Sequence, residues 1–236
     1  MTVALFMMIV LCASILQTST GFGFSIMATP FLLLIFEPNE AIQINLIASL
    51  MISLALISTI KKDVDTGILK RFIIGSVPGL GVGILIFLWA DARQLKLAIG
   101  LLMLLFTILL IANRRITRST RKDVVVGGLS GAFTTGIGMP GPPLLIYFAG
   151  SATSKEVLRA TTLTFYLYIY AVSLVIQVVF AGTTKTTWLA SVGALPLIAA
   201  GLWIGQRMFD KISPKGFQAF IYIILLVTAV TLFISA

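Results

Sequence analysis

The chain has 236 residues, of which 58% are hydrophobic and only 11% are charged, and its mean hydropathy is +1.08. This composition excludes a water-soluble domain of this size and indicates an integral membrane protein made of helices. The net charge of +9 comes from basic residues in loops between apolar segments, as membrane topology requires. We therefore expect the lipid bilayer as a partner and no nucleic acid.

Residue types that carry catalytic or metal chemistry are scarce. Cys12 is the single cysteine and the chain has no histidine, which excludes an internal disulfide, an imidazole relay and a His-ligated metal or haem. We expect no catalytic residues, no metal and no cofactor, and a membrane enzyme is disfavoured. The chain has no Walker motif, so direct use of ATP is not expected. The N-terminus lacks the features of a signal peptide and is interpreted as mature structure.

Apolar segments succeed one another along the chain, most of them near the roughly 20 residues that a spanning helix needs. They cover residues 2–36, 41–60, 67–90, 94–112, 124–148, 157–181, 188–206 and 217–236. The first and the fifth are interrupted near their middle by glycine and proline, which favour breaks in a helix. Each arm of the fifth segment is about 12 residues, or about 18 Å, which reaches only the membrane midplane.

The two interruptions have similar sequences. The first is Thr20-Gly21-Phe22-Gly23, and the second is Thr135-Gly136-Ile137-Gly138 followed by a proline-rich run. A broken helix leaves backbone groups unpaired at a cost of several kcal/mol each in hydrocarbon, so each break must be shielded by protein or line a cavity. Paired breaks in corresponding halves point to a transport site. The alternative is that the glycines only allow close helix packing.

Further matches at a nearly constant offset extend this repeat. Adding 115 takes the first break onto the second, adding 116 takes Glu40 to Glu156, and adding 118 takes Gly75, Pro78 and Gly83 to Gly193, Pro196 and Gly201. We therefore predict a first transmembrane repeat over residues 1–112, a basic cytoplasmic linker over 113–123 and a second transmembrane repeat over 124–236.

The relative orientation of the two repeats depends on whether the broken segments cross the membrane. If each crosses once, the halves are parallel; if each is a re-entrant hairpin, the halves are inverted. With the linker in the cytoplasm, the inverted arrangement leaves only Arg93, Lys96 and Lys185 of the 17 basic residues outside, whereas the parallel one leaves seven. Basic residues concentrate inside. We predict an all-α multi-pass protein of the cell (inner) membrane, with inverted halves that each contain a broken-helix hairpin and three transmembrane helices.

Both broken stretches resemble a known family. T-G-F-G-F-S-x-x-A-T-P at residues 20–30 and T-G-I-G-M-P-G-P-P-L-L-x-Y at residues 135–147 are similar to motifs of the TauE/SafE (TSUP) family. The resemblance implies a membrane protein of two homologous halves that moves sulfite, sulfonates or other sulfur-containing organic anions. It does not specify the substrate. Many members have a longer glycine run after the G-x-G, where this chain has Phe24 and Met139.

An anion at membrane depth needs donors that replace its water. The helix after each break offers free backbone N–H groups and about half a positive charge from its dipole, and glycine lets the anion approach them. Neither motif contains an acid, which favours an anion or a neutral solute over a cation. Each Ser or Thr hydroxyl has the alternative of bonding to the carbonyl one turn back. The predicted substrate-binding residues are Thr20, Gly21, Gly23, Ser25, Asn45, Thr135, Gly136, Gly138, Arg159 and Thr161.

Arg159 has the clearest charge-based role among these residues. It lies about one turn into its segment on the cytoplasmic side, and the matched residue of the first half is the uncharged Gln43. An arginine there would gather anions from the cytoplasm and favour export. The alternative is a snorkelling anchor that only fixes topology. By the same offset Asn45 matches Thr161, and we expect both to line the cavity.

Two other pairs have open alternatives. Glu40 and Glu156 begin helices, with Asn39 and Ser154 as expected caps, so they either stabilise helix N-termini or take part in gating or proton coupling. Tyr166 and Tyr170 share a helix face and form either a pore wall or a contact in a homodimer.

The leading functional interpretation is a secondary transporter that exports a small sulfur-containing anion, namely sulfite or a short organosulfonate such as sulfoacetate. The alternatives are an anion channel of the same architecture and a transporter for another small organic anion. A cation transporter is disfavoured because the sequence suggests no buried acid.

Overall fold

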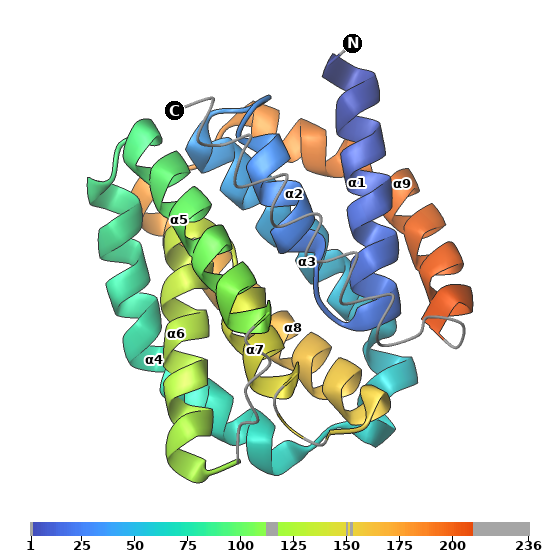
Figure 1. Cartoon of the computed structure of the whole chain (residues 1–236). Coiled ribbons are helices and arrows are strands. Elements are labelled where there is room, and N and C mark those ends of the chain that lie inside the picture. The colour runs from blue at the N-terminus through green and yellow to red at the C-terminus, as the bar shows by residue number, and fades with distance from the viewer. Residues whose placement is uncertain (1, 112–117, 150, 152, 210–236) are drawn as a thin grey trace.

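The computed structural model describes residues 2–111, 118–149, 151 and 153–209, and all regular structure in these ranges is helical (Figure 1). The helices are α1 (Thr2–Thr20), α2 (Phe24–Leu32), α3 (Pro38–Ile60), the 3-10 turn η1 (Lys61–Asp63), α4 (Thr66–Trp89), α5 (Ala92–Ile111), α6 (Thr120–Ile137), α7 (Gly141–Ala149), α8 (Lys155–Ala181) and α9 (Lys185–Phe209). Helices α1, α3 (with η1), α4, α8 and α9 are long and apolar enough to cross a membrane. The apolar segment predicted at 217–236 lies outside the described residues.

Both predicted helix breaks are present. The first lies between α1 and α2, where Gly21 and Gly23 adopt φ values of 88° and 118°. The second lies between α6 and α7, where Gly138 adopts φ 72°. Side chains with a Cβ disfavour this left-handed region, so glycine is what allows the chain to turn there. After each break the short helix, α2 or α7, turns back beside the long helix that precedes it (Figure 1).

Close backbone packing joins α4 to α6. A Cβ at Gly75 would lie 2.0 Å from the Val124 carbonyl oxygen, and a Cβ at Gly79 would lie 2.0 Å from that of Gly128. The two helices can therefore approach so closely only because these positions are glycine, as in other small-residue membrane interfaces. Helix α9 packs on α1 in a similar way, where a Cβ at Gly201 would lie 2.4 Å from the Cβ of Ser14.

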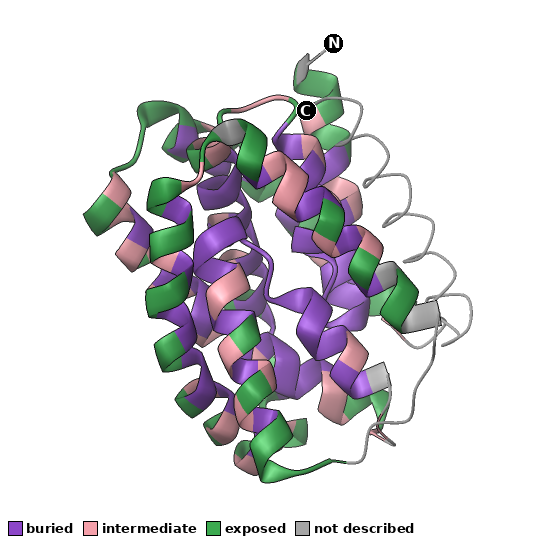
Figure 2. Ribbon diagram, turned by 60° about the vertical axis from the view of Figure 1, so that its left-hand side comes forward, coloured by how far each residue is buried: buried purple, intermediate pink, exposed green. Residues whose placement is uncertain are grey.

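The outer surface of the bundle is apolar between its two ends. Figure 2 shows buried residues gathered inside the bundle and exposed residues on the outer faces of the helices. Large side chains such as Leu189, Val179 and Trp89 are 73%, 70% and 80% exposed. A surface of this kind is suited to lipid, with tryptophans near helix ends at the level of the headgroups.

Basic residues gather at one end of the molecule, where α3 ends and α4, α6 and α8 begin (Figure 1). They are Lys61, Lys62, Lys70, Arg71, Arg118, Arg121, Lys122 and Lys155. Helix α6 begins at Thr120, inside the segment predicted as linker, so residues 120–123 belong to its first turn. Arg114 and Arg115 lie outside the described residues.

Candidate functional site

The first helix break lies against α8. A Cβ at Gly21 would lie 2.8 Å from the Cα of Arg159 and 3.2 Å from its Cγ, so the chain at the break touches the α8 backbone. Arg159 is only 7% exposed, and its guanidinium carbon lies 4.4 Å from the centre of the Phe209 ring on α9. A snorkelling anchor would extend into water. The Arg159 side chain is instead enclosed between the first break and the end of α9.

Helix α3 covers the second break. The amide nitrogen of Asn45 donates a hydrogen bond of 2.7 Å to the Gly138 carbonyl oxygen, and Ile42 lies against the same glycine. Asn45 and Ile42 belong to the first half of the sequence, whereas Arg159 belongs to the second. Each break is therefore shielded by the opposite half, which meets the demand that broken backbone at membrane depth be enclosed by protein.

Between the two breaks lies a group of buried polar side chains that we call the central polar cluster. Its members come from α2, α3 and α8, and all are fully buried: Ser25, Asn45, Ser49, Tyr166 and Tyr170. Their hydroxyl oxygens and the Asn45 side-chain oxygen have no hydrogen-bond partner among the residues that the structure describes. A buried polar atom without a partner costs about 1–3 kcal/mol. Several such atoms together indicate a place where a polar ligand or water completes the bonding.

Contacts across helices bring these side chains together. The Ser25 and Ser49 hydroxyls lie close to that of Tyr170, although not in hydrogen-bonding geometry. The Tyr166 ring lies 4.9 Å from that of Tyr170, centre to centre, and its hydroxyl is 3.0 Å from where a Cβ at Gly141 would stand. The start of α7 thus borders the cluster.

The two short helices offer unequal numbers of backbone donors. In α2 the first hydrogen bond runs from the Met27 N–H to the Gly23 carbonyl, 2.9 Å long, so the earlier N–H groups lie beyond the helical bonding pattern. Helix α7 begins Gly141-Pro142-Pro143, and proline has no N–H. The helix dipole and unbonded N–H groups should therefore attract an anion at the start of α2 and do so much more weakly at the start of α7.

The three predicted threonines have partners in the protein. Thr20 donates a 2.6 Å bond to the Leu16 carbonyl one turn back, which is the alternative expected for a hydroxyl in a helix. Thr135 lies 2.9 Å from the Ser173 hydroxyl, and Thr161 accepts a 3.0 Å bond from the N–H of Asp65. The structure does not bring Thr135 and Thr161 into the central polar cluster.

The four predicted glycines have different neighbours. Gly21 and Gly138 are at the breaks and face the opposite half, as described above. Gly23 faces Leu16 of α1, and a Cβ at Gly23 would lie 2.6 Å from the Leu16 Cδ2. Gly136 lies in the α4–α6 interface, where a Cβ on it would lie 3.3 Å from the Gly83 carbonyl oxygen, so it serves close helix packing. Its role in binding stays a prediction.

Sequence reasoning missed Ser49 and left the tyrosines open between a pore wall and a dimer contact. Ser49 lies one turn after Asn45 on α3, and the same helical spacing relates Tyr166 to Tyr170. The polar face of α3 could have been found by that spacing. Both tyrosines are fully buried inside the bundle, so they are part of the central polar cluster and do not face a second protomer.

The expectation of no buried acid is wrong. Asp123 is 2% exposed at the start of α6, and Asp123 and Arg159 are the only charged side chains buried within the described part of the chain. The Asp123 carboxylate accepts a 2.6 Å bond from Arg71 Nε on α4 and another from the Tyr147 hydroxyl on α7. Asp123 was predicted to lie in the basic cytoplasmic linker, where its carboxylate would be exposed to water.

The two matched glutamates stand at helix starts. Ser154 caps α8 by accepting a bond from the Val157 N–H, as predicted, and Glu156 is exposed in the first turn. The cap of α3 is Glu37 rather than Asn39, because Pro38 occupies the first helical position. Glu40 accepts a 2.7 Å bond from the Thr184 hydroxyl, which joins α3 to the start of α9.

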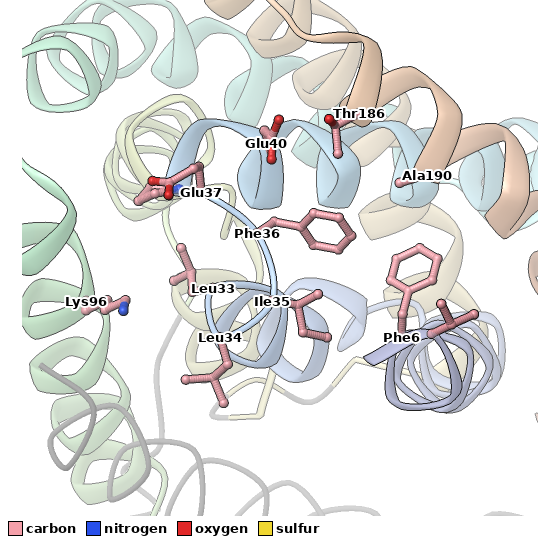
Figure 3. A pocket seen from close by; sticks show the side chains of 12 residues that line it. Phe6, Leu33, Leu34, Ile35, Phe36, Glu37, Glu40, Lys96, Thr186 and Ala190 are labelled. Atoms are coloured by element: carbon pink, nitrogen blue, oxygen red, sulfur yellow. The ribbon is translucent and has the colours of Figure 1, made fainter. Parts of the chain in front are cut away.

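A cavity of about 740 Å³ opens at the end of the molecule opposite the basic one. Its walls come from the start of α1, the α2–α3 connection, α5 and α9 (Figure 3). Both Glu37 and Glu40 line it, together with Lys96 of α5 and apolar side chains such as Phe6 and Phe36. None of the predicted binding residues lines this cavity.

The comparison with protein families decides the identity of the chain. The sequence model of the sulfite exporter TauE/SafE family matches residues 6–232, which is nearly the whole chain. The chain belongs to the TauE/SafE family. Among curated proteins and among solved structures, no match was found. TauE/SafE membership implies transport of the sulfite or anion exporter type, and it agrees with the apolar helices of a multi-pass membrane protein.

Proposed function

We propose that this TauE/SafE protein is a secondary transporter of the cell membrane that exports a small sulfur-containing anion, either sulfite or a short organosulfonate. The observation that carries the proposal is the central polar cluster, whose buried hydroxyls lack hydrogen-bond partners among the described residues and lie between the two helix breaks. Tetrahedral and pyramidal oxyanions present several acceptor oxygens at once. Hydroxyls and the first N–H groups of α2 are donors that match such a ligand.

The two halves are proposed to be inverted repeats. Each short helix returns beside its preceding helix, and the following helices start from opposite ends of the molecule (Figure 1). The basic end then faces the cytoplasm by the positive-inside rule. The site lies between the halves, as in other transporters built from inverted repeats.

Arg159 is proposed to attract anions from the cytoplasm toward this site. It belongs to the first turns of α8, on the same helix as Tyr166 and Tyr170, and its Cα touches the first break at Gly21. A buried guanidinium next to the break attracts anions more strongly than one in water, because the local dielectric is lower. The matched residue of the first half is the uncharged Gln43, so anions are attracted from the cytoplasmic side only, which favours export.

An anion channel of the same architecture remains the second candidate, and the same donors would serve it. A carrier is distinguished by saturable transport with counterflow. For binding itself we would measure thermal unfolding of the purified protein with sulfite, sulfate, thiosulfate, sulfoacetate, taurine and chloride, since a ligand stabilises the state that binds it.

Stabilisation should be largest with sulfite or sulfoacetate, and Tyr170→Phe should reduce it because the variant loses one buried donor while keeping the ring. Tyr168→Phe is the matched control, because Tyr168 is a partly exposed tyrosine of the same helix outside the cluster. If no anion raises the unfolding temperature of the wild type, or if both variants respond as the wild type does, the cluster is not the binding site.

A further inference from the structure

The two short helices differ in how they are held. Helix α7 carries one polar side chain that can reach a neighbour, Tyr147, and its hydroxyl donates to the buried carboxylate of Asp123. That carboxylate also accepts the 2.6 Å bond from Arg71. One acid therefore joins α4, α6 and α7. A hydrogen bond to a buried charge is among the stronger polar contacts in a protein, because either group left alone would be costly.

Aromatic packing reinforces the same attachment. The Phe72 ring of α4 lies 6.0 Å from Tyr147 and 5.9 Å from Phe148 of α7, each at a steep angle, and 5.5 Å from Phe165 of α8. Edge-to-face pairs at these distances are favourable. Because α4 and α6 are themselves in backbone contact, α7 is fastened to the most tightly packed pair of helices in the described chain.

Helix α2 has no comparable polar attachment. Its polar side chains are Ser25 and Thr29, and neither hydroxyl has a hydrogen-bond partner among the described residues. By the repeat offsets of 115 and 116, Asp123 corresponds to Met8 or Met7 and Tyr147 to Leu32 or Phe31, so the first half has apolar residues where the second has the acid and the phenol. The repeat is therefore symmetric in its breaks and asymmetric in the polar contacts that hold its short helices.

We propose that Asp123 and Tyr147 are positioning residues that make α7 the fixed side of the transport site, and that α2 is the side that moves. The fixed side presents Gly141 to Tyr166, and the mobile side carries Ser25 and the free N–H groups at the start of α2. This division fits the unequal donors of the two helices. Helix α7 has prolines in place of N–H donors and forms a fixed wall of the site, whereas α2 has the donors and closes on the anion. The role of α2 in transport rests on the proposed function; the attachment of α7 does not.

Hydrogen exchange of the purified full-length protein tests the attachment without any substrate. Amide exchange would be followed by mass spectrometry for the amides of 144–149 in α7 and of 27–32 in α2. In the wild type, the α2 amides should exchange faster than the α7 amides, because α2 opens more readily. In Tyr147→Phe, α7 exchange should rise about ten- to a hundredfold, the usual weight of a hydrogen bond to a charged group, while α2 exchange stays unchanged.

Tyr147→Phe retains the ring that packs on Phe72, so its effect reports the hydroxyl alone. Asp123→Asn keeps the size of the acid and should raise α7 exchange in the same way, and Tyr168→Phe should change neither helix. Equal exchange of α2 and α7 in the wild type, or wild-type α7 exchange in Tyr147→Phe, would overturn the proposal. If the attachment is confirmed while an anion that raises the unfolding temperature of the wild type leaves α2 exchange unchanged, the mobile role of α2 is refuted and the fixed role of α7 stands. If no anion raises that temperature, the proposed function fails and the attachment of α7 is unaffected.

Discussion

Replacing Gly79 by alanine should separate α4 from α6, whereas the same replacement at Gly81 should be tolerated. The Cβ of alanine at 79 would stand 2.0 Å from the Gly128 carbonyl oxygen and 2.9 Å from the Ala132 nitrogen. Both atoms are backbone, and ordinary contact needs about 3.5 Å, so the helices must move apart by more than 1 Å. A Cβ at Gly81 meets nothing within 4 Å.

The magnitude follows from the kind of contact. Overpacking a well-packed interior lowers the free energy of unfolding by about 1–3 kcal/mol, and by more where the backbone must shift. Gly79→Ala should therefore lower it by about 3 kcal/mol or more. Gly81→Ala should change stability by no more than about 1 kcal/mol, and in the favourable direction, since alanine is the better helix former. Both variants make the same glycine-to-alanine change within the same helix, so the difference between their stabilities isolates the contact with α6.

Reversible unfolding in mixed detergent micelles would measure the two stabilities under identical conditions. The α4–α6 contact also holds the second break in place, because a Cβ at Gly83 would stand 2.9 Å from the Cβ of Thr135. Gly79→Ala should therefore weaken anion binding as well. Equal stability losses at 79 and 81 would refute the close approach of the two helices.

The remaining predictions concern charge and topology. Arg159→Gln should weaken apparent anion affinity mostly at low salt, because charge attraction is screened over about 8 Å at physiological ionic strength. Arg159→Lys should retain part of the wild-type affinity. Equal affinities of the three proteins at every salt concentration would contradict the steering role. Single cysteines at Thr120 and Ser154 should react with an impermeant reagent from the cytoplasm and one at Thr184 from outside. Labelling of 184 together with 120, but not of 154, would exclude inverted halves.

The sequence alone was sufficient to locate both helix breaks because glycine and proline act locally on backbone conformation. The contacts that define the site are different, since they depend on which helix lies opposite. Gly21 meets Arg159 and Gly138 meets Asn45 across the two halves, and no spacing along the chain reveals that pairing. Symmetry between the repeats suggested equivalent roles for Thr20 and Thr135, whereas the structure gives each its own partner within the protein.

Buried charge was the least predictable feature. Asp123 lies in a run of basic residues, and such runs are normally solvated, so its burial depends on Arg71 and Tyr147 arriving from other helices. The unequal donors of α2 and α7 could have been derived from the sequence, because the absence of N–H groups at Pro142 and Pro143 follows from composition. Because the two breaks have similar sequences, we expected equal donors at both.

Counterflow of radiolabelled sulfite in liposomes that contain the purified protein tests the central claim most directly. Vesicles preloaded with unlabelled sulfite should accumulate labelled sulfite transiently above its equilibrium level, with a rate that saturates, and Tyr170→Phe should lower the apparent affinity while Tyr168→Phe does not. Sulfite entry that never saturates, or the absence of any accumulation above protein-free liposomes for sulfite and sulfoacetate alike, would contradict a carrier with its binding site at the central polar cluster.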